Sequence, residues 1–214
     1  ALVPRARSIA ATRFLLDSDA DVLLTIDGDI EFRAADALEI CRQAMTYEIV
    51  AGVYTTRDRD RRCSPTSMFL RNEPIKFMGD PTPRPILWAA TGFLAIHRPV
   101  IEALARRDDM PLCHPKTLRF HPFYDCFVSR DDDGDPIYLS EDYAICERAR
   151  EEGFTVYCNP KVRLGHAGVF TYYLEHMLQD TPPALPIELE LYDTPAKWRA
   201  EVIDTSAREL VAVH

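Results

Sequence analysis

Several patterns that readily assign a protein to a class are missing from this chain of 214 residues. Its six cysteines show no C-x-x-C spacing, which excludes the usual zinc ribbon and redox pair. No stretch approaches the roughly 20 apolar residues of a membrane span, and no signal peptide is visible. Scattered cysteines are typical of reduced thiols in the cytosol. We therefore expect a cytoplasmic protein with no transmembrane segment.

Positive charge is also scarce, with 25 basic against 34 acidic residues and a formal charge of −9. Such a chain is a poor match to a nucleic-acid backbone, so we expect no nucleic-acid partner. A small anionic ligand is still compatible, provided that a metal or nearby arginines supply positive charge. With 47% hydrophobic residues, the chain can bury the core of one ordinary domain, with or without an appendage.

The chain does not begin with Met, and a helical pattern starts almost at once. We therefore expect a fragment, or a protein cut at its amino end, from which a targeting signal could have been lost. At the other end, prolines 182, 183 and 186 indicate a linker. Residues 187–214 are open to three interpretations: an added helix, a partner contact, or a lead to a further domain.

The first quarter of the chain predicts alternating helices and strands. Residues 5–17 form an amphipathic pattern, and 21–26 read as a buried strand. Residues 34–46 predict a helix with Ala37, Leu38, Cys41 and Met45 on one face, and 48–54 predict a strand. This alternation is typical of a parallel α/β sheet, in which a right-handed crossover places the two strand ends side by side.

Further along, proline and glycine divide the chain into short elements. Three prolines (81, 83 and 85) exclude a helix, and 88–97 read as a strand, a bend at Gly92 and a second strand. The charged run at 57–62 predicts a solvated loop, and an Asp-Gly tip at 131–135 predicts a hairpin. Helices are predicted at 99–107, from Ser140 to Gly153, and at 170–179. Strands are predicted at 154–158 and 162–166.

Asp27-Gly28-Asp29 closes the first predicted strand. Because side chains alternate along a strand, an Asp-x-Asp pair sends two carboxylates to one face. Gly28 allows a ligand close to the backbone. Two hard oxygen ligands at a strand end suit a divalent cation that bridges phosphates. Taken alone, the tripeptide is also a good strand-to-loop turn.

Three further features each have an ordinary structural interpretation when taken singly. Thr91-Gly92 reads as a bulge. Glu141 and Asp142 in the first turn of a helix are favourable partners of its dipole. His166, which closes the strand after Asn159-Pro160, reads as a buried core histidine.

Together and in this order, these motifs resemble the GT-A family of nucleotide-sugar-dependent glycosyltransferases, over roughly residues 3–176. The resemblance rests on FLLDSDADVLLTIDGDIEF, IVAGVY, ATGFLAIHRPV and YLSEDYAICERAREEGFTVYCNPKVRLGHAG. It implies an α/β fold of the GT-A type, which is Rossmann-like with three α/β/α layers and a mixed, mainly parallel central sheet. Residues 1–180 would form one catalytic domain, and 181–214 a linker and tail.

The resemblance also implies roles for individual residues. Mn²⁺ or Mg²⁺ would be held by the metal ligands Asp27, Asp29 and His166. Asp142 would be the catalytic base of an inverting reaction, with Glu141 as its neighbour or substitute. The donor would contact Asp27, Thr91 and Gly92. Arg5 and Arg7, near the start of the first helix, are a further candidate contact to the nucleotide, and a solvated helix end is the alternative interpretation. Retaining members of the family carry similar acids, so the stereochemistry stays open.

Several alternatives remain at this point. The family begins with a strand and turn that contact the nucleotide base, about 50 residues before Asp-x-Asp, and only 26 residues precede it here. UDP is therefore the expected nucleotide by default, with GDP open. The other functional interpretations are a nucleotidyltransferase that makes nucleotide sugars and a non-catalytic binding domain.

The acceptor is also open: it would be a saccharide, a lipid-linked sugar or a protein, and a lipid-linked acceptor would allow peripheral membrane association. Five aromatic residues offer stacking surfaces for a sugar but are also typical of a hairpin core: Phe120, Phe123, Tyr124, Phe127 and Tyr138.

Overall fold

The structure is a computed structural model, and its description covers residues 2–57, 64–70, 75–77, 79–131, 133–174, 187–191, 200–204 and 209–211. Most of the predicted charged loop at 57–62, and residues 175–179 of the predicted helix at 170–179, lie outside these ranges. The last three ranges are described for their backbone alone.

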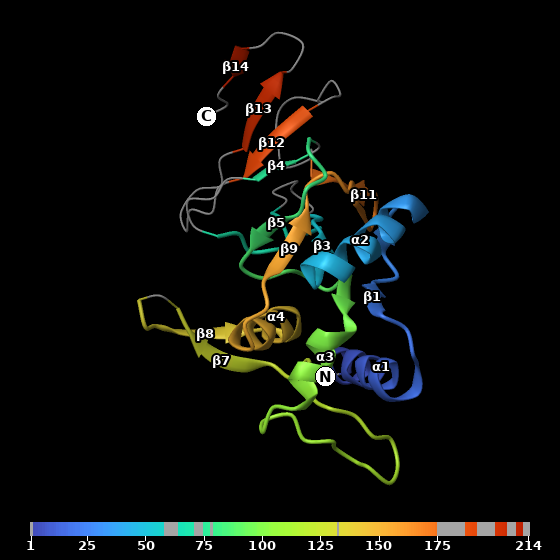
Figure 1. Ribbon diagram of the computed structural model, residues 1–214. Helices are drawn as coiled ribbons and strands as arrows, with labels where there is room; N and C mark the ends of the chain where they lie inside the picture. Colours follow the sequence, from blue (N-terminus) through green and yellow to red (C-terminus); the bar gives the residue numbers. More distant parts are fainter. Residues whose placement is uncertain are drawn as a thin grey trace.

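A five-stranded sheet forms the centre of the fold (Figure 1). Its strands, in spatial order, are β1 (Val22–Ile26), β6 (Phe93–His97), β3 (Ile49–Gly52), β9 (Val156–Asn159) and β5 (Arg84–Ile86). Only β3 and β9 pair in parallel, whereas β1–β6, β6–β3 and β9–β5 are antiparallel. The α/β class and the mixed sheet are confirmed, but the prediction of a mainly parallel sheet is wrong.

The error has a single topological cause. Strand β6 lies between β1 and β3, and it runs antiparallel to both. The two strands joined by helix α2 (Ala34–Tyr47) are therefore parallel to each other but are not neighbours. Local sequence patterns predict a strand at 93–97 but carry no information about the partners that it chooses.

Helices cover both faces of this sheet. On one face, α1 (Val3–Asp17), α3 (Arg98–Ala105) and α4 (Glu141–Glu151) contribute to a core that includes Leu94 and Ile96 of β6. On the other face, α2 packs against Phe93 and Ala95. Because successive β6 residues point to opposite faces, one strand serves both cores. The result is three layers, with helices on either side of the sheet.

The buried face of α2 differs from the predicted one. Leu38 is 73% exposed and Met45 is 47% exposed, whereas Ile40 and Ala44 are completely buried. Ala37 and Cys41 do pack against the same core. The apolar stripe therefore follows the i, i+3, i+4, i+7 spacing from residue 37, and Leu38 and Met45 lie beside it.

A small three-stranded sheet holds the segment that follows Asp27-Gly28-Asp29. Its strands are, in order, β11 (Thr171–Tyr172), β10 (Gly165–Ala167) and β2 (Ile30–Glu31). In this sheet His166 is the register partner of Ile30, and the amide of Ala167 donates to the carbonyl of Asp29 over 2.7 Å. The predicted helix at 170–179 is wrong at its start, because residues 171–172 are strand.

The predicted hairpin and the helix after it are both present. The strands β7 (Phe127–Arg130) and β8 (Pro136–Leu139) pair antiparallel and lead directly into α4. Ser140 is the N-cap residue by position, although its hydroxyl makes no capping hydrogen bond. Gly153, beyond the end of α4, has a φ of 88°, which explains the glycine at this position.

A separate antiparallel sheet contains the described residues near the C-terminus. Its strands are, in order, β14 (Glu209–Val211), β13 (Ala200–Asp204), β12 (Ile187–Leu191) and β4 (Ile75–Phe77). The described part of 187–214 is therefore strand rather than the added helix. Strand β12 pairs antiparallel with β4, and the division at residue 180 stays a prediction.

Within the described ranges, no helix has both the length and the apolar character that crossing a membrane requires. Cys41, Cys113, Cys126, Cys146 and Cys158 are free thiols.

Candidate functional site

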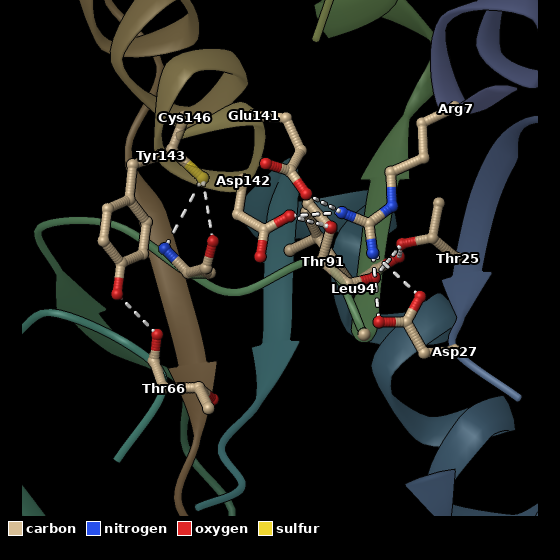
Figure 2. A network of polar contacts seen from close by, with 12 residues as sticks. Arg7, Thr25, Asp27, Thr66, Thr91, Leu94, Glu141, Asp142, Tyr143 and Cys146 are labelled. Carbon is tan, nitrogen blue, oxygen red and sulfur yellow. Dashed lines mark hydrogen bonds and ion pairs between the residues drawn. The ribbon is translucent and has the colours of Figure 1, made fainter. Parts of the chain in front are cut away.

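Arg7 lies at the centre of three carboxylates that come from distant parts of the sequence (Figure 2). Its Nη2 donates to both oxygens of Asp27, over 2.8 and 3.0 Å. Its Nη1 donates to Glu141 Oε1 over 3.2 Å and to Asp142 Oδ1. The start of α1, the end of β1 and the first turn of α4 therefore meet at one guanidinium, and we call these four residues the Arg7 cluster.

Asp142 is fixed through only one of its two carboxylate oxygens. Oδ1 accepts hydrogen bonds from Arg7 and from the hydroxyl of Thr91. Oδ2 has no hydrogen-bond partner among the described residues, and Figure 2 shows it turned away from both donors. The carboxylate is thus oriented while it keeps one oxygen available to accept a proton.

Burial raises the pKa of Asp142, and the negative charges of Glu141 and Asp27 raise it further. The Thr91 hydroxyl and the Arg7 guanidinium act in the opposite direction, but they do not outweigh burial. A carboxyl group with a raised pKa is suited to proton transfer, because a base works best when its pKa approaches the working pH.

The bend at Thr91-Gly92 brings β6 against the end of β1. The carbonyl of Gly92 accepts from the amide of Asp27 over 2.9 Å, and the Gly92 amide donates to the Tyr54 hydroxyl over 3.2 Å. A Cβ at residue 92 would lie 2.2 Å from that hydroxyl oxygen and 3.1 Å from Asp27 Oδ2. The glycine is required by this close approach, and the bend thereby fixes Asp27 and Asp142 together.

Asp29, two residues after Asp27, belongs to a different set of contacts. Its Oδ2 lies 3.5 Å from His166 Nε2 and 3.1 Å from Arg57 Nη1. His166 Nδ1 lies 2.7 Å from the carbonyl oxygen of Thr55, which can only accept a hydrogen bond. In neutral His166 the proton is therefore on Nδ1, and the lone pair of Nε2 faces Asp29.

This pair has the chemistry of a partial metal site. A histidine that donates its other ring N–H to a backbone carbonyl is the usual arrangement of a metal ligand. Mg²⁺ and similar cations are often bound by one or two protein groups together with substrate phosphates and water. The pair fits such an ion, although no group of three or more His, Cys, Asp or Glu side chains within the described ranges is arranged to hold one.

The predicted metal ligands therefore do not converge as one set. Asp27 forms its ion pair with Arg7, whereas Asp29 and His166 face each other. A tight turn separates the two aspartates, in which the amide of Ile30 donates to the carbonyl of Asp27 over 3.1 Å. No heavy atom lies within 4 Å of where a Cβ of Gly28 would be, so the space beside this turn is open.

Tyr54 connects the two sets of contacts, although no motif of the sequence predicts a role for it. Its hydroxyl accepts from the Gly92 amide, and its ring lies edge-on to that of His166, with 5.2 Å between the ring centroids. Burial raises its pKa, and the charges of Asp142 and Asp27 add to this effect. The tyrosine is therefore a neutral, buried side chain that packs between the Arg7 cluster and His166.

Two sequence signals pointed toward residues that were missed. Tyr54 ends the predicted strand that follows the Asp-x-Asp strand in the sequence, and ligands bind at strand ends in α/β folds. Arg57 opens the charged run at 57–62 that was interpreted as solvated. Neither signal was specific enough to single out the residue.

Arg5 does not join the other candidate residues. It is exposed, and its guanidinium lies over the ring of Phe120, 5.6 Å from the centroid. Of the aromatic residues proposed for acceptor stacking, Phe123 and Tyr124 are completely buried. Tyr138 is 70% exposed on β8, which leads into Glu141.

Comparison with known proteins leaves this site without an assignment. No protein-family model matches the chain, and no curated protein matches it. One solved structure that matches is the crystal structure of A197 from STIV, with a TM-score of 0.44 and 15% identity. That alignment covers 99% of this chain and 76% of the other. A likeness at this level says nothing about the activity of this chain.

Proposed function

We propose that this chain is a metal-dependent glycosyltransferase that transfers a sugar from a nucleotide-sugar donor, by default a UDP-sugar, to an acceptor hydroxyl. The observation that carries the proposal is the division of Asp27-Gly28-Asp29 between two sets of contacts. Asp27 shares Arg7 with an oriented carboxylate, and Asp29 faces a histidine in the tautomer of a metal ligand.

Asp142 is the proposed base. Its Oδ2 accepts the proton of the acceptor hydroxyl as the acceptor oxygen forms a bond to the anomeric carbon. The bond between that carbon and the diphosphate breaks at the same time, and the nucleoside diphosphate leaves with the electron pair. Direct displacement inverts the configuration. A carboxylate whose Oδ1 is held by two donors cannot rotate freely, which favours a single productive orientation.

The charge balance of the site favours a divalent cation. Four carboxylates, those of Asp27, Asp29, Glu141 and Asp142, face two guanidinium groups. An anionic diphosphate would be repelled by the excess negative charge. Mn²⁺ or Mg²⁺ held by Asp29 and His166 would supply the missing positive charge and would stabilise the charge that develops on the leaving phosphate.

Arg7 is proposed to contact the donor from the side opposite the Asp29–His166 pair. Its side chain is 14% exposed, so it is held in place before any ligand binds. Bound in this way, it keeps Asp27 and Asp142 close together despite their like charges. In the bend before β6, the Thr91 hydroxyl donates to the Asp142 carboxylate and the Gly92 carbonyl accepts from the Asp27 amide, and these supporting contacts are the roles that we assign to the two residues.

The test is release of nucleoside diphosphate from a panel of UDP- and GDP-sugars, with Mn²⁺ and with EDTA. Turnover should require Mn²⁺ and should be lost in Asp29→Ala. The matched control is Asp17→Ala, since Asp17 is also exposed and paired with an arginine. Turnover that is undiminished in EDTA and in Asp29→Ala would contradict the proposal.

The same assays separate the alternatives. Release of pyrophosphate from a nucleoside triphosphate would favour a nucleotidyltransferase that makes nucleotide sugars. Absence of binding to both nucleotide and Mn²⁺ would favour a non-catalytic domain.

A further inference from the structure

Arg57 makes two contacts at the Asp29 side of the site. Its Nη1 lies 3.1 Å from Asp29 Oδ2 and donates to the carbonyl oxygen of Ala167 over 2.9 Å. Its side-chain stem passes close to Gly168, since a Cβ at that residue would lie 3.0 Å from the Arg57 Cδ atom. The guanidinium is therefore placed beside the His166 strand by contacts that do not depend on Asp29 alone.

The pair between Arg57 and Asp29 is much more exposed than the arrangement around Arg7. The Arg57 side chain is 44% exposed and that of Asp29 is 38% exposed, against 14% for Arg7. Among the described residues, Arg57 pairs with one carboxylate, whereas Arg7 contacts three. An ion pair in contact with water contributes little, so it is easily exchanged for another partner.

One carboxylate oxygen of Asp29 faces both Arg57 and His166. Asp29 Oδ2 is the atom that faces both Arg57 Nη1 and His166 Nε2. A divalent cation bound between Asp29 and His166 would use this oxygen and would repel the guanidinium. The contact with Ala167 would keep Arg57 nearby, where its planar donors suit a phosphate.

We propose that Arg57 is an exchangeable counter-cation: it neutralises Asp29 when no metal is bound, and it moves to the phosphates of the nucleotide when the metal takes Asp29. The metal half of this proposal needs only the Asp29–His166 pair, whereas the nucleotide half rests on the proposed function. Removing Arg57 should therefore have opposite effects on two binding reactions.

The experiment measures Mn²⁺ binding by the loss of the free-ion signal in electron paramagnetic resonance, and UDP binding by calorimetry in saturating Mn²⁺. In Arg57→Ala, Mn²⁺ alone should bind more tightly by up to about fivefold, which is the worth of an exposed ion pair. UDP should bind roughly tenfold more weakly, because a charge-assisted contact to phosphate is lost. Arg57→Gln removes the charge but keeps a donor for Ala167, and it should reproduce the effect on Mn²⁺.

The matched control is Arg119→Ala, which removes an exposed arginine from its pair with Asp17 and should change neither reaction. Suppose that wild-type protein binds Mn²⁺ and UDP, but that Arg57→Ala leaves both affinities unchanged or weakens both. The proposed exchange of Arg57 is then wrong, whereas the proposed function stands. If wild-type protein binds neither ligand, the proposed function fails first and the exchange fails with it.

Discussion

Asp27 and Asp29 are nearly equally exposed, at 41% and 38% of their side-chain surface, yet their surroundings differ sharply. The arginine bound to Asp27 is 14% exposed and contacts three carboxylates, whereas the arginine bound to Asp29 is 44% exposed and contacts one within the described part of the chain. One half of the tripeptide is therefore held in a buried network, and the other half makes the exposed contact that we propose to be exchangeable.

In the proposed transfer reaction, this difference separates two requirements. The base must be oriented before the substrate arrives, and the proposed base Asp142 is oriented by Arg7 and Thr91. The proposed cation site must exchange partners, and the exposed ion pair at Asp29 suits that exchange. We therefore expect substitutions in the two halves to have different effects.

The largest effect is expected from Asp142→Asn. Turnover should fall by about 10²- to 10⁴-fold, because a positioned base contributes on that scale. Binding of UDP with Mn²⁺ should stay within about threefold of wild type, because the cation side is untouched. Initial-rate kinetics and calorimetry measure the two quantities. Full turnover in Asp142→Asn would mean that the base is wrongly assigned and would favour a retaining mechanism.

The pH profile of turnover should reflect the raised pKa of Asp142. Because only the ionised carboxylate accepts a proton, the rate should fall about tenfold per pH unit below a midpoint above the ordinary aspartate value of about 3.9. The same shift means that folded protein binds this proton more tightly than unfolded protein, so acidification through the midpoint favours folding at this group. Turnover rates measured from about pH 4 to about pH 8 locate the acidic limb of the pH–rate profile. A limb at the ordinary value would contradict the burial that raises the pKa.

Arg7→Ala should destabilise the fold far more than Arg57→Ala. Removing Arg7 leaves three partly buried carboxylates without their cation, which should cost about 1–3 kcal/mol after allowance for their exposure. Arg57→Ala should change stability by no more than about 0.5 kcal/mol. Thermal melts compare the two variants, and the first should lose roughly 3–10 °C. Equal losses in the two variants would remove the distinction between a fixed and an exchangeable half.

A smaller effect is expected at the two glycines. Gly92→Ala introduces a methyl group 2.2 Å from the Tyr54 hydroxyl oxygen and should cost about 1–3 kcal/mol. Gly28→Ala meets no heavy atom within 4 Å and should cost less than about 0.5 kcal/mol. Denaturant unfolding gives both values, and Tyr54→Phe should recover part of the loss in the Gly92→Ala background. Equal losses of unfolding free energy in the two variants would show that the bend does not depend on the close approach of Gly92 to Tyr54.

Local sequence patterns predicted the elements that depend on neighbouring residues. The helix of residues 3–17, the strand before Asp27 and the helix after Ser140 each follow from periodicity or from a cap. The insertion of β6 between β1 and β3 did not follow, because strand pairing depends on residues far apart in the chain. For that reason the sheet was expected to be mainly parallel.

The candidate site shows the same limit. Motif order identified Arg7, Asp27, Asp142 and Thr91, which the fold brings into contact. The separation of Asp27 from Asp29 was not foreseen, since alternation along an extended strand predicts one shared face. The turn that starts at Asp27 ends that alternation, and this is the physical reason for the two halves.

The most direct test of the central claim is calorimetric titration of UDP, with GDP in parallel, in Mn²⁺ and in EDTA. Wild-type protein should bind a nucleoside diphosphate only when Mn²⁺ is present. Asp29→Ala and His166→Ala should each lose most of that metal-dependent affinity, by at least about tenfold. Binding that is unaffected by EDTA and by both substitutions, or no binding under any of these conditions, would contradict the account.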